Sequence, residues 1–352
     1  MPSERKVVLI TGATGGIGAA TAIAFAKTGQ YELALHYNNA SQEKRDTLRS
    51  TIEAAAPTFD PRTGTPIPSK PRLEFYQADM SDFASVRALH AAVTQTFPHI
   101  DVLFNNAGSA LGHQGVISLA SVPIDVFEST WRVNTGSAIL LTQLCLPAME
   151  AQGWGRVVFD SSVAALTGGS VGPHYASSKS GLHGFVHWLA GNVAGKGITV
   201  NAVAPALVTG TGMMGEEGGE VARRMAGSEL ISVLGAGPAT GRPEEIADTV
   251  LWMVNTAYVT NKIITVDGLL CLRCRSVSHD AEQCPRLEAL VRIVVGGRNP
   301  VLSSTPIPYG IVRPPGELLQ PKSLRYGVGM RSSTDVCVQR SSSPSYFLSG
   351  RM

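Results

Sequence analysis

Runs of apolar, often β-branched residues recur over the first 267 residues and alternate with longer segments of helical period. The apolar runs predict seven strands, at Lys6–Thr11, Glu32–Tyr37, Arg72–Gln77, Asp101–Phe104, Arg156–Asp160, Thr199–Val203 and Lys262–Val266. The helical segments between them include Gly16–Thr28, Asp82–Phe97, Val122–Glu150, Tyr175–Ala194 and Pro243–Val254. Strands that are apolar throughout and alternate with helices are typical of a parallel sheet with helices on both faces. The pattern therefore predicts an α/β fold with a doubly wound, seven-stranded parallel sheet.

The alternation stops near residue 270, so we expect a single domain at residues 1–270 and a tail at 271–352. Within the domain, residues 57–71 contain five prolines and are expected to form an enlarged loop. The tail has 12 Ser, eight Pro and ten Arg but only one short apolar run, Leu290–Val295. It is expected to be mostly disordered, because it cannot bury enough apolar surface to fold.

Composition and charge are consistent with this division. The 352 residues are 44% hydrophobic, and no stretch approaches the roughly 18–20 apolar residues that span a bilayer. The lead before the first strand is too short for a secretory or transit signal, so we expect an intracellular, cytoplasmic protein; a mitochondrial matrix location stays open. Residues 1–270 carry 18 Lys and Arg against 22 Asp and Glu, whereas the tail carries 11 against five.

A glycine-rich turn, Thr11–Gly18 (TGATGGIG), joins the first predicted strand to the first helix. Glycines permit a tight turn and the close approach of backbone to a pyrophosphate. The helix that follows offers unpaired N–H groups and a positive dipole end to phosphate. A purely structural turn would have the same composition, but the position at the first strand–helix junction favours a dinucleotide site.

The spacing T-G-x-x-x-G-x-G and the motifs after it resemble those of the short-chain dehydrogenase/reductase family over about residues 6–270. The further motifs are, in chain order, Asp79-Met80, Asn105-Asn106-Ala107-Gly108, Asn134, Ser162, Tyr175-x-x-x-Lys179 and Asn201-x-x-x-Pro205. The resemblance implies a Rossmann-type fold and a bound nicotinamide cofactor. The implied cofactor residues are Gly12, Thr14, Gly15, Gly16, Ile17, Gly18, Tyr37, Asn38, Asp79, Met80, Asn106, Ala107, Gly108, Tyr175, Lys179, Pro205 and Val208. Asp79 and Met80 would bind adenine, and the segment after Pro205 would fold over the nicotinamide.

The end of the second predicted strand bears on the choice of cofactor. An acid there would bond the ribose 2′-hydroxyl and repel a 2′-phosphate. This chain has His36-Tyr37-Asn38-Asn39 instead, and the nearest cations are Lys44 and Arg45. We therefore expect NADP(H). NAD(H) stays an alternative, because Gly15 stands where many NADP-using relatives have a basic residue.

Tyr175 and Lys179 lie four residues apart on a predicted helix and so share one face. An ammonium near a phenol favours the phenolate and is expected to bring the tyrosine pKa toward neutrality. The resemblance implies that Tyr175 moves the proton, Lys179 also holds the nicotinamide ribose, and Ser162 holds the substrate carbonyl. Asn134 would anchor a water that completes the relay. Each residue alone also fits a structural role, and their combination and order are what point to catalysis.

Two neighbouring features need a separate interpretation. His174, beside Tyr175, is interpreted as at most a residue lining the substrate pocket. A Ser-His-Asp hydrolase is excluded, because no G-x-S-x-G turn follows a strand. The reaction expected from the resemblance is hydride transfer between nicotinamide and a carbonyl or carbinol carbon.

The segments Val200–Pro205, Leu234–Ile246 and Tyr258–Gly268 resemble those of 3-oxoacyl-[acyl-carrier-protein] reductases and their carbonyl-reductase relatives. This implies NADPH-dependent reduction of a 3-oxoacyl thioester in fatty acid biosynthesis, and a homo-oligomer, expected to be a tetramer. A carbonyl reductase, or a hydroxysteroid or alcohol dehydrogenase acting on another hydrophobic ketone, is the alternative. The loop Ala206–Gly227, rich in Gly and Met, would set specificity, and the candidate residues for docking acyl carrier protein are Arg132, Arg223 and Arg224.

Two details depart from the family pattern. Ala206 replaces the usual glycine after Pro205. The threonine expected at the carboxamide is either Thr209 or Thr211, so Val208 is the firmer assignment there.

The tail offers a competing class of function. Cys271, Cys274, His279 and Cys284 have the spacing of a CCHC zinc knuckle, a module that binds single-stranded nucleic acid, and the tail is basic. The glycines common in knuckles are absent, however, and the first cysteine follows Gly268 by only three residues. We interpret the tail as an extension foreign to the reductase and dispensable for catalysis. No metal is assigned to the reductase site, and neither nucleic acid nor a membrane is expected as a partner.

Overall fold

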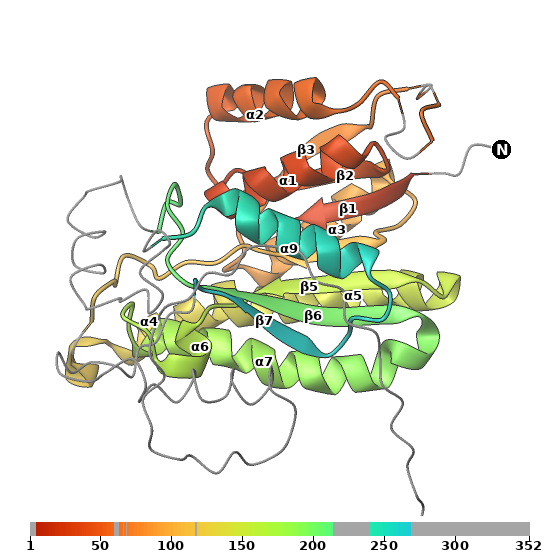
Figure 1. The fold of residues 1–352 in the computed structure, drawn as a ribbon. Coiled ribbons are helices and arrows are strands. Elements are labelled where there is room, and N and C mark those ends of the chain that lie inside the picture. The colour runs from red at the N-terminus through yellow and green to blue at the C-terminus, as the bar shows by residue number, and fades with distance from the viewer. Residues whose placement is uncertain are drawn as a thin grey trace, which may run out of the picture. The chain divides into compact units, whose positions relative to one another are not determined.

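The computed structural model describes residues 5–59, 63–65, 67, 69–116, 118–213 and 240–268 (Figure 1). Its strands form one seven-stranded sheet in the order β3-β2-β1-β4-β5-β6-β7, with every neighbouring pair parallel. The strands are β1 (Lys6–Ile10), β2 (Tyr31–Tyr37), β3 (Leu73–Gln77), β4 (Val102–Asn105), β5 (Gly155–Asp160), β6 (Ile198–Pro205) and β7 (Lys262–Val266). The predicted Rossmann-type sheet is confirmed, and the predicted strand ends differ from the observed ones by at most two residues.

Helices cover the sheet on both faces (Figure 1). Their bounds are α1 (Gly16–Thr28), α2 (Gln42–Ala55), α3 (Phe83–Thr96), α4 (Ile124–Trp131), α5 (Ser137–Gln152), α6 (Ala164–Thr167), α7 (Pro173–Val193) and α9 (Pro243–Asn255). Apolar side chains of α1, α2 and α9 pack on one face, and those of α3, α5 and α7 pack on the other. Alternate residues of each strand therefore enter different cores: Val8 and Ile10 of β1 face α1, whereas Val7 and Leu9 face α5.

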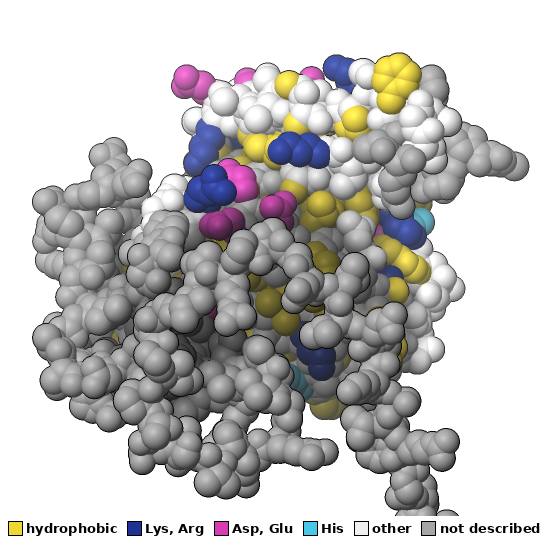
Figure 2. Space-filling model, in the orientation of Figure 1, with side chains coloured by type: hydrophobic (Ala, Val, Ile, Leu, Met, Phe, Trp, Pro, Cys, Tyr) yellow, Lys and Arg dark blue, Asp and Glu magenta, His cyan; other side chains and the backbone are white. Residues whose placement is uncertain are grey.

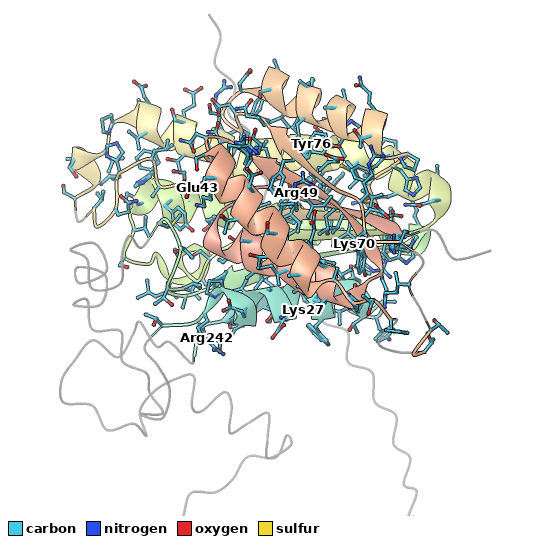
Figure 3. All side chains as sticks on the ribbon, turned by 90° about the horizontal axis from the view of Figure 1, so that it is seen from above. Lys27, Glu43, Arg49, Lys70, Tyr76 and Arg242 are labelled. Atoms are coloured by element: carbon cyan, nitrogen blue, oxygen red, sulfur yellow. The ribbon has the colours of Figure 1, made fainter. Side chains whose placement is uncertain are left out.

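Side-chain caps explain where two of these helices begin. Ser41 accepts a hydrogen bond from the Lys44 N–H at the start of α2, and Asp82 accepts two from the first turn of α3. Figure 3, which looks onto α2, shows Glu43 at the beginning of this helix and Arg49 further along it. Arg49 donates a hydrogen bond to the Leu73 carbonyl at the start of β3, so α2 is tied to the edge strand of the sheet.

The helix predicted over Val122–Glu150 is confirmed to within two residues, because helical backbone runs from Ile124 to Gln152, but it is not α-helical throughout. The structure has α4, then a π-helical turn at Arg132–Gly136, then α5. The apolar period runs through this turn, so the pattern could not reveal the extra residue that a π turn contains. The turn carries Asn134, whose side chain bonds with the backbone of Ser109 rather than facing solvent.

Other predictions fall partly or wholly outside the described residues. The described part of residues 57–71 forms no helix or strand, in keeping with the expected loop. The predicted disorder of residues 271–352 and the candidate zinc ligands Cys271, Cys274, His279 and Cys284 lie outside the described residues. Within the described ranges, no helix is long and apolar enough to cross a membrane.

Candidate active site

A cavity of about 680 Å³ opens at the carboxyl ends of the central strands. The sheet order reverses direction between β1 and β4, and such a switch point is where ligands bind in doubly wound folds. The predicted cofactor residues that line the cavity are Gly12, Thr14, Gly15, Gly16, Ile17, Gly18, Asn38, Asp79, Met80, Asn106, Ala107, Gly108, Tyr175, Pro205 and Val208. Tyr37 and Lys179 are not among the lining residues.

The glycine-rich turn is shaped by backbone contacts that a side chain would block. Gly12 has a φ of 65°, and the Gly15 N–H donates to the Gly12 carbonyl at 3.0 Å. A Cβ built on Gly18 would lie 2.3 Å from that same carbonyl oxygen, so the helix must approach the turn without a side chain. No side chain caps the start of α1 at Gly15, which leaves the helix N–H groups available to an anion. This cradle fits the pyrophosphate of a dinucleotide.

The glycine-rich turn is also held in place by His36. The sequence analysis named His36 only as one of the residues at the end of the second strand, where no acid is present. Its Nδ1 accepts a hydrogen bond from the Gly12 N–H at 3.0 Å, and its Nε2 contacts the Ala78 carbonyl at 3.1 Å. These two partners require the neutral ring with its proton on Nε2. Burial lowers the pKa of His36, consistent with the neutral form.

The floor of the cavity is formed by contacts between the ends of β1 and β4. Asn106 donates to the Thr11 carbonyl at 2.7 Å, while the Thr11 hydroxyl accepts the backbone N–H groups of Asn106 and Ala107. Asn106 therefore positions the loop in addition to lining the cavity.

Tyr37 does not reach the cavity. Successive side chains of a strand point to opposite faces, so His36 takes the cavity side and Tyr37 faces α2. There the Tyr37 ring lies 4.3 Å from the Arg45 guanidinium carbon. Arg45 in turn donates to the Ala40 carbonyl, so this candidate cation already has partners.

The structure brings the four predicted catalytic residues together. Tyr175 and Ser162 both line the cavity, and the Ser162 hydroxyl acts on Tyr175 in the direction that lowers its pKa. The Lys179 Nζ lies 5.8 Å from the Tyr175 ring centroid and donates to the Asp160 carbonyl at 2.5 Å. A Cβ built on Gly108 would lie 3.1 Å from Lys179 Nζ and 3.4 Å from Asn134 Oδ1, so both groups stand directly behind that glycine.

The Asn134 side chain makes three hydrogen bonds, two with Ser109 and one with Ser178. Its oxygen accepts the Ser109 N–H at 2.8 Å, and its amide nitrogen donates to the Ser109 carbonyl and to the Ser178 hydroxyl. These bonds join the loop after β4 to α7. The water that Asn134 is expected to anchor stays a prediction.

The ionisation of the catalytic pair differs from the sequence expectation. Burial raises the pKa of Tyr175 above its ordinary value, the nearby charge of Asp160 raises it further, and the bond with Ser162 opposes both. Burial lowers the pKa of Lys179, and Asp160 opposes that shift. The net direction for Tyr175 is therefore upward, because desolvation and a neighbouring acid dominate.

Asp160 is a second functional candidate that sequence analysis missed. It is the last residue of β5, it lines the cavity, and burial raises its pKa to about 6, with the Lys179 charge opposing. In the sequence, Asp160 directly follows the apolar run Val157–Phe159, and this position could have marked it as a candidate. The sequence analysis counted Asp160 only as the last residue of the predicted strand Arg156–Asp160.

His174, for which a role in lining the pocket was the most that was predicted, does not line the cavity. The residue is fully buried, and its ring contacts the Ala110 carbonyl at 3.3 Å. Its ring also packs against His113 and Phe127. His174 therefore supports the loop after β4 from behind.

The two threonines predicted as alternatives at the carboxamide differ in their placement after β6. Thr211 lines the cavity, whereas Thr209 turns away and donates to the Gly241 carbonyl. Ala206, which replaces the family glycine, fits without a positive φ and donates its N–H to the Val266 carbonyl. Arg223, Arg224 and the rest of the predicted specificity loop beyond Met213 lie outside the described residues.

Metal ligation finds no support in the part of the chain that is described. No three His, Cys, Asp or Glu side chains there gather in an arrangement that could hold a metal ion.

Comparison with known proteins agrees with this geometry. The family model described as short chain dehydrogenase matches residues 6–221. The 3-oxoacyl-[acyl-carrier-protein] reductase FabG of Thermotoga maritima is 33% identical over 278 residues, covering 77% of this chain and all of that protein. The 7alpha-hydroxysteroid dehydrogenase of Bacteroides fragilis is 27% identical, covering 76% of this chain and 95% of that protein. The crystal structure of a blue fluorescent protein from a metagenomic library, in complex with NADPH, has a TM-score of 0.62 and 30% identity over 75% of this chain and 96% of its own.

The chain belongs to the short-chain dehydrogenase family. It is an oxidoreductase of a family that uses a nicotinamide cofactor and acts on hydroxyl or carbonyl groups.

Proposed function

We propose that this protein reduces a 3-oxoacyl thioester with NADPH and that Tyr175 donates the proton. The observation that carries the proposal is that Ser162 and Tyr175 line one cavity together with the glycine-rich turn, while the Lys179 ammonium lies 5.8 Å from the Tyr175 ring. The 33% identity to a relative named as a 3-oxoacyl-[acyl-carrier-protein] reductase supports the choice of substrate class.

The chain's own residues account for binding and proton transfer. The start of α1 and Gly12–Gly18 bind the pyrophosphate, and the reduced nicotinamide, when bound, supplies the hydride. Ser162 and Tyr175 hold the substrate carbonyl oxygen, and Tyr175 gives that oxygen its proton. Lys179 lies behind Tyr175, and with Asn134 it is proposed to return a proton to the phenol.

The preference for NADPH is proposed from the residues near the end of β2. His36, Asn38 and Asn39 line the cavity there, and none of them is an acid. Exposed Lys44 sits in the first turn of α2, where the helix dipole also favours a phosphate. Thr14 and Lys44 border one hollow, although Glu43 borders it as well.

Two classes of substrate fit the comparisons with known proteins. A hydrophobic ketone such as a steroid is the second candidate, and the 27% identity to a 7alpha-hydroxysteroid dehydrogenase favours keeping it. Acyl carrier protein is proposed as the carrier, with Arg132 as the one docking candidate that is described; its side chain pairs with Glu128 at 3.4 Å.

We also propose a homotetramer as the working form. Large apolar side chains lie exposed on two regions: Trp252 of α9 with nearby Tyr258, and Trp131 of α4 with Trp188 of α7. Exposed apolar groups of this size are typical of protein interfaces. Nucleic acid is not proposed as a partner of the domain, because the coloured part of the face seen in Figure 2 carries both basic and acidic side chains rather than basic ones alone.

The decisive experiment follows NADPH consumption with acetoacetyl-CoA, with a ketosteroid as the competing substrate. Turnover of the thioester and tighter binding of NADPH than NADH are expected. Tyr175→Phe should abolish turnover, a loss of about a thousandfold or more, while NADPH binding measured by fluorescence stays unchanged. Activity retained in this variant contradicts the mechanism. Turnover of the steroid alone contradicts the substrate.

A further inference from the structure

Leu111, in the loop after β4, has a backbone conformation that large side chains rarely adopt. Its φ is 51°, in the left-handed region, and the other described residue besides glycine with a positive φ is Asn261. Asparagine tolerates this region because its short polar side chain can hydrogen-bond locally, whereas leucine has no such compensation. Residues strained in this way persist where the surrounding structure holds them, and they cluster at functional sites.

Burial does not offset the strain at Leu111. The residue is 38% exposed, so much of its apolar side chain stays in contact with water. The same side chain lines the cavity of the active site. The next residue, Gly112, has a φ of 80° and is a glycine, the residue that this conformation favours. A leucine at position 111 therefore gains little for the fold, and its place beside the cavity points to the substrate.

Hydrogen bonds on both sides hold Leu111 in this conformation. Its N–H donates to the Ser109 hydroxyl at 2.9 Å, and the His113 N–H donates to the Ala110 carbonyl at 2.9 Å. The backbone of Ser109 is bonded in turn to the side chain of Asn134. The turn that presents Leu111 is thus joined to the catalytic set through Asn134.

This turn lies at the end of the cavity that contains Tyr175. Ala110, directly before Leu111, is buried in an apolar cluster together with Tyr175. Such a surface beside the proposed proton donor suits the carbon chain attached to a reacting carbonyl group. Leu111 extends the apolar surface to a position that is open to solvent. The other residues of the cluster, or packed against it, that line the cavity are Ala164, Val171, Leu207 and Met213.

We propose that Leu111 is a specificity-determining residue, whose side chain contacts the apolar chain of the carbonyl substrate where that chain leaves the cavity. The inference rests on the proposed reduction of a hydrophobic carbonyl compound at Tyr175. Contact removes apolar surface of both Leu111 and the substrate from water, so the gain in binding grows with the length of the chain. A substrate with a short chain does not reach this leucine.

The test compares Leu111→Gly and Leu111→Asn with the wild type in the full-length protein. Both replacements suit the left-handed conformation, so the melting temperature is expected to stay level or rise by up to about 4 °C. The ratio of kcat/KM for 3-oxooctanoyl-CoA to that for acetoacetyl-CoA is expected to fall roughly tenfold. An unchanged ratio, or a lower melting temperature in both variants, assigns Leu111 to the fold and overturns the proposal.

Asn261→Gly is the matched control. Asn261 has a φ of 60°, and it does not line the cavity. Its N–H donates to the Val200 carbonyl and its side chain contacts His187, so it belongs to the turn before β7. This variant is expected to leave the ratio of the two kcat/KM values unchanged. A change as large as that in the Leu111 variants contradicts a local contact with the substrate.

A binding measurement separates this inference from the proposed function. Ligand-observed NMR on the cofactor-free protein compares 2-decanone, a ketone with a long apolar chain, with 2-butanone. The wild type is expected to bind 2-decanone more tightly, and Leu111→Gly is expected to lose most of that preference, roughly tenfold. If the wild type reduces neither thioester, the proposed substrate is wrong, yet the binding of the ketones still decides the role of Leu111. Equal preference in the wild type and Leu111→Gly overturns the inference, as does a wild type that binds both ketones alike.

Discussion

His36 shows how a single side chain can set the geometry of a cofactor site. Its ring joins three segments, because it lies in β2, accepts the Gly12 N–H, and reaches the Ala78 carbonyl after β3. Only the neutral ring makes both contacts, and the residue is 1% exposed. Protonation therefore removes the acceptor that holds the glycine-rich turn.

We expect NADPH affinity to fall when the pH drops through the pKa of folded His36, which burial places below the ordinary histidine value of about 6.5. The pKa of His36 is lowered in the folded protein, so the unfolded chain binds the proton more readily. The stability that His36 contributes is then present above pH 6.5 and is lost as the pH falls through the lower, folded pKa. Fluorescence titration of NADPH at several pH values, with thermal melting at each, measures both effects.

The matched variants are His36→Leu and His90→Leu. His36→Leu leaves the Gly12 N–H without its acceptor, which costs about 1–3 kcal/mol, or roughly a five- to 150-fold loss of affinity, at neutral pH. His90 on α3 is also partly buried with a lowered pKa, but it does not line the cavity. If both variants bind NADPH like the wild type, His36 does not position the turn.

At the scale of elements, the close packing of α1 on the turn after β1 requires a residue without a side chain at Gly18. Gly18, in the first turn of α1, lies so close to the Gly12 carbonyl that a Cβ would be 2.3 Å away, and 2.8 Å from the Ala13 Cα. Both neighbours are backbone atoms, which move only if the whole turn moves. Close packing of helix on turn is what directs the start of α1 at the cavity.

Gly18→Ala is therefore expected to destabilise the domain by about 1–3 kcal/mol and to weaken NADPH binding by roughly tenfold or more. The control is Gly191→Ala on α7, where a Cβ meets nothing within 4 Å. That change is expected to stabilise the protein by about 0.5–1 kcal/mol, because alanine favours a helix interior. Thermal melting and NADPH fluorescence decide the outcome, and equal behaviour of the two variants refutes the packing argument.

At the scale of the whole molecule, the assigned catalytic and cofactor residues precede residue 270. Among the described residues, the last strand β7 ends at Val266, and α9 packs in the core on one face of the sheet. The tail contributes none of the proposed chemistry. We interpret it as dispensable for the reaction.

A chain that ends after Leu270 is expected to keep NADPH binding and turnover within about twofold, because no assigned contact is lost. Light scattering on the truncated and full chains at micromolar concentration reports the oligomeric state, for which a tetramer is expected. A folded truncated chain without NADPH binding would make the tail part of the enzyme. A monomeric mass for both chains would refute the tetramer.

The sequence by itself determined the parallel sheet, the glycine-rich turn and the set Asn134, Ser162, Tyr175 and Lys179. The sheet and the turn rest on local periodicity and glycine spacing, and the catalytic set rests on the resemblance of its motifs and their order to a known family. Tyr175 and Lys179, four positions apart, can be recognised along the chain in this way. Helix ends and strand ends were accurate to within two residues where apolar runs stopped sharply. The π turn at Arg132–Gly136 was missed, because the apolar pattern continues through it.

The tertiary structure decided which side chains share the cavity. Tyr37 and His174 lie outside it, whereas His36 and Asp160 line it. Contacts such as those of His36 with Gly12, 24 residues away, and Asp160 with Lys179, 19 residues away, depend on strand order and register. The sequence analysis expected the pKa of Tyr175 to be lowered, whereas in the structure it is raised. Burial and the nearby charge of Asp160 raise it, and both act on Tyr175 only in the folded chain.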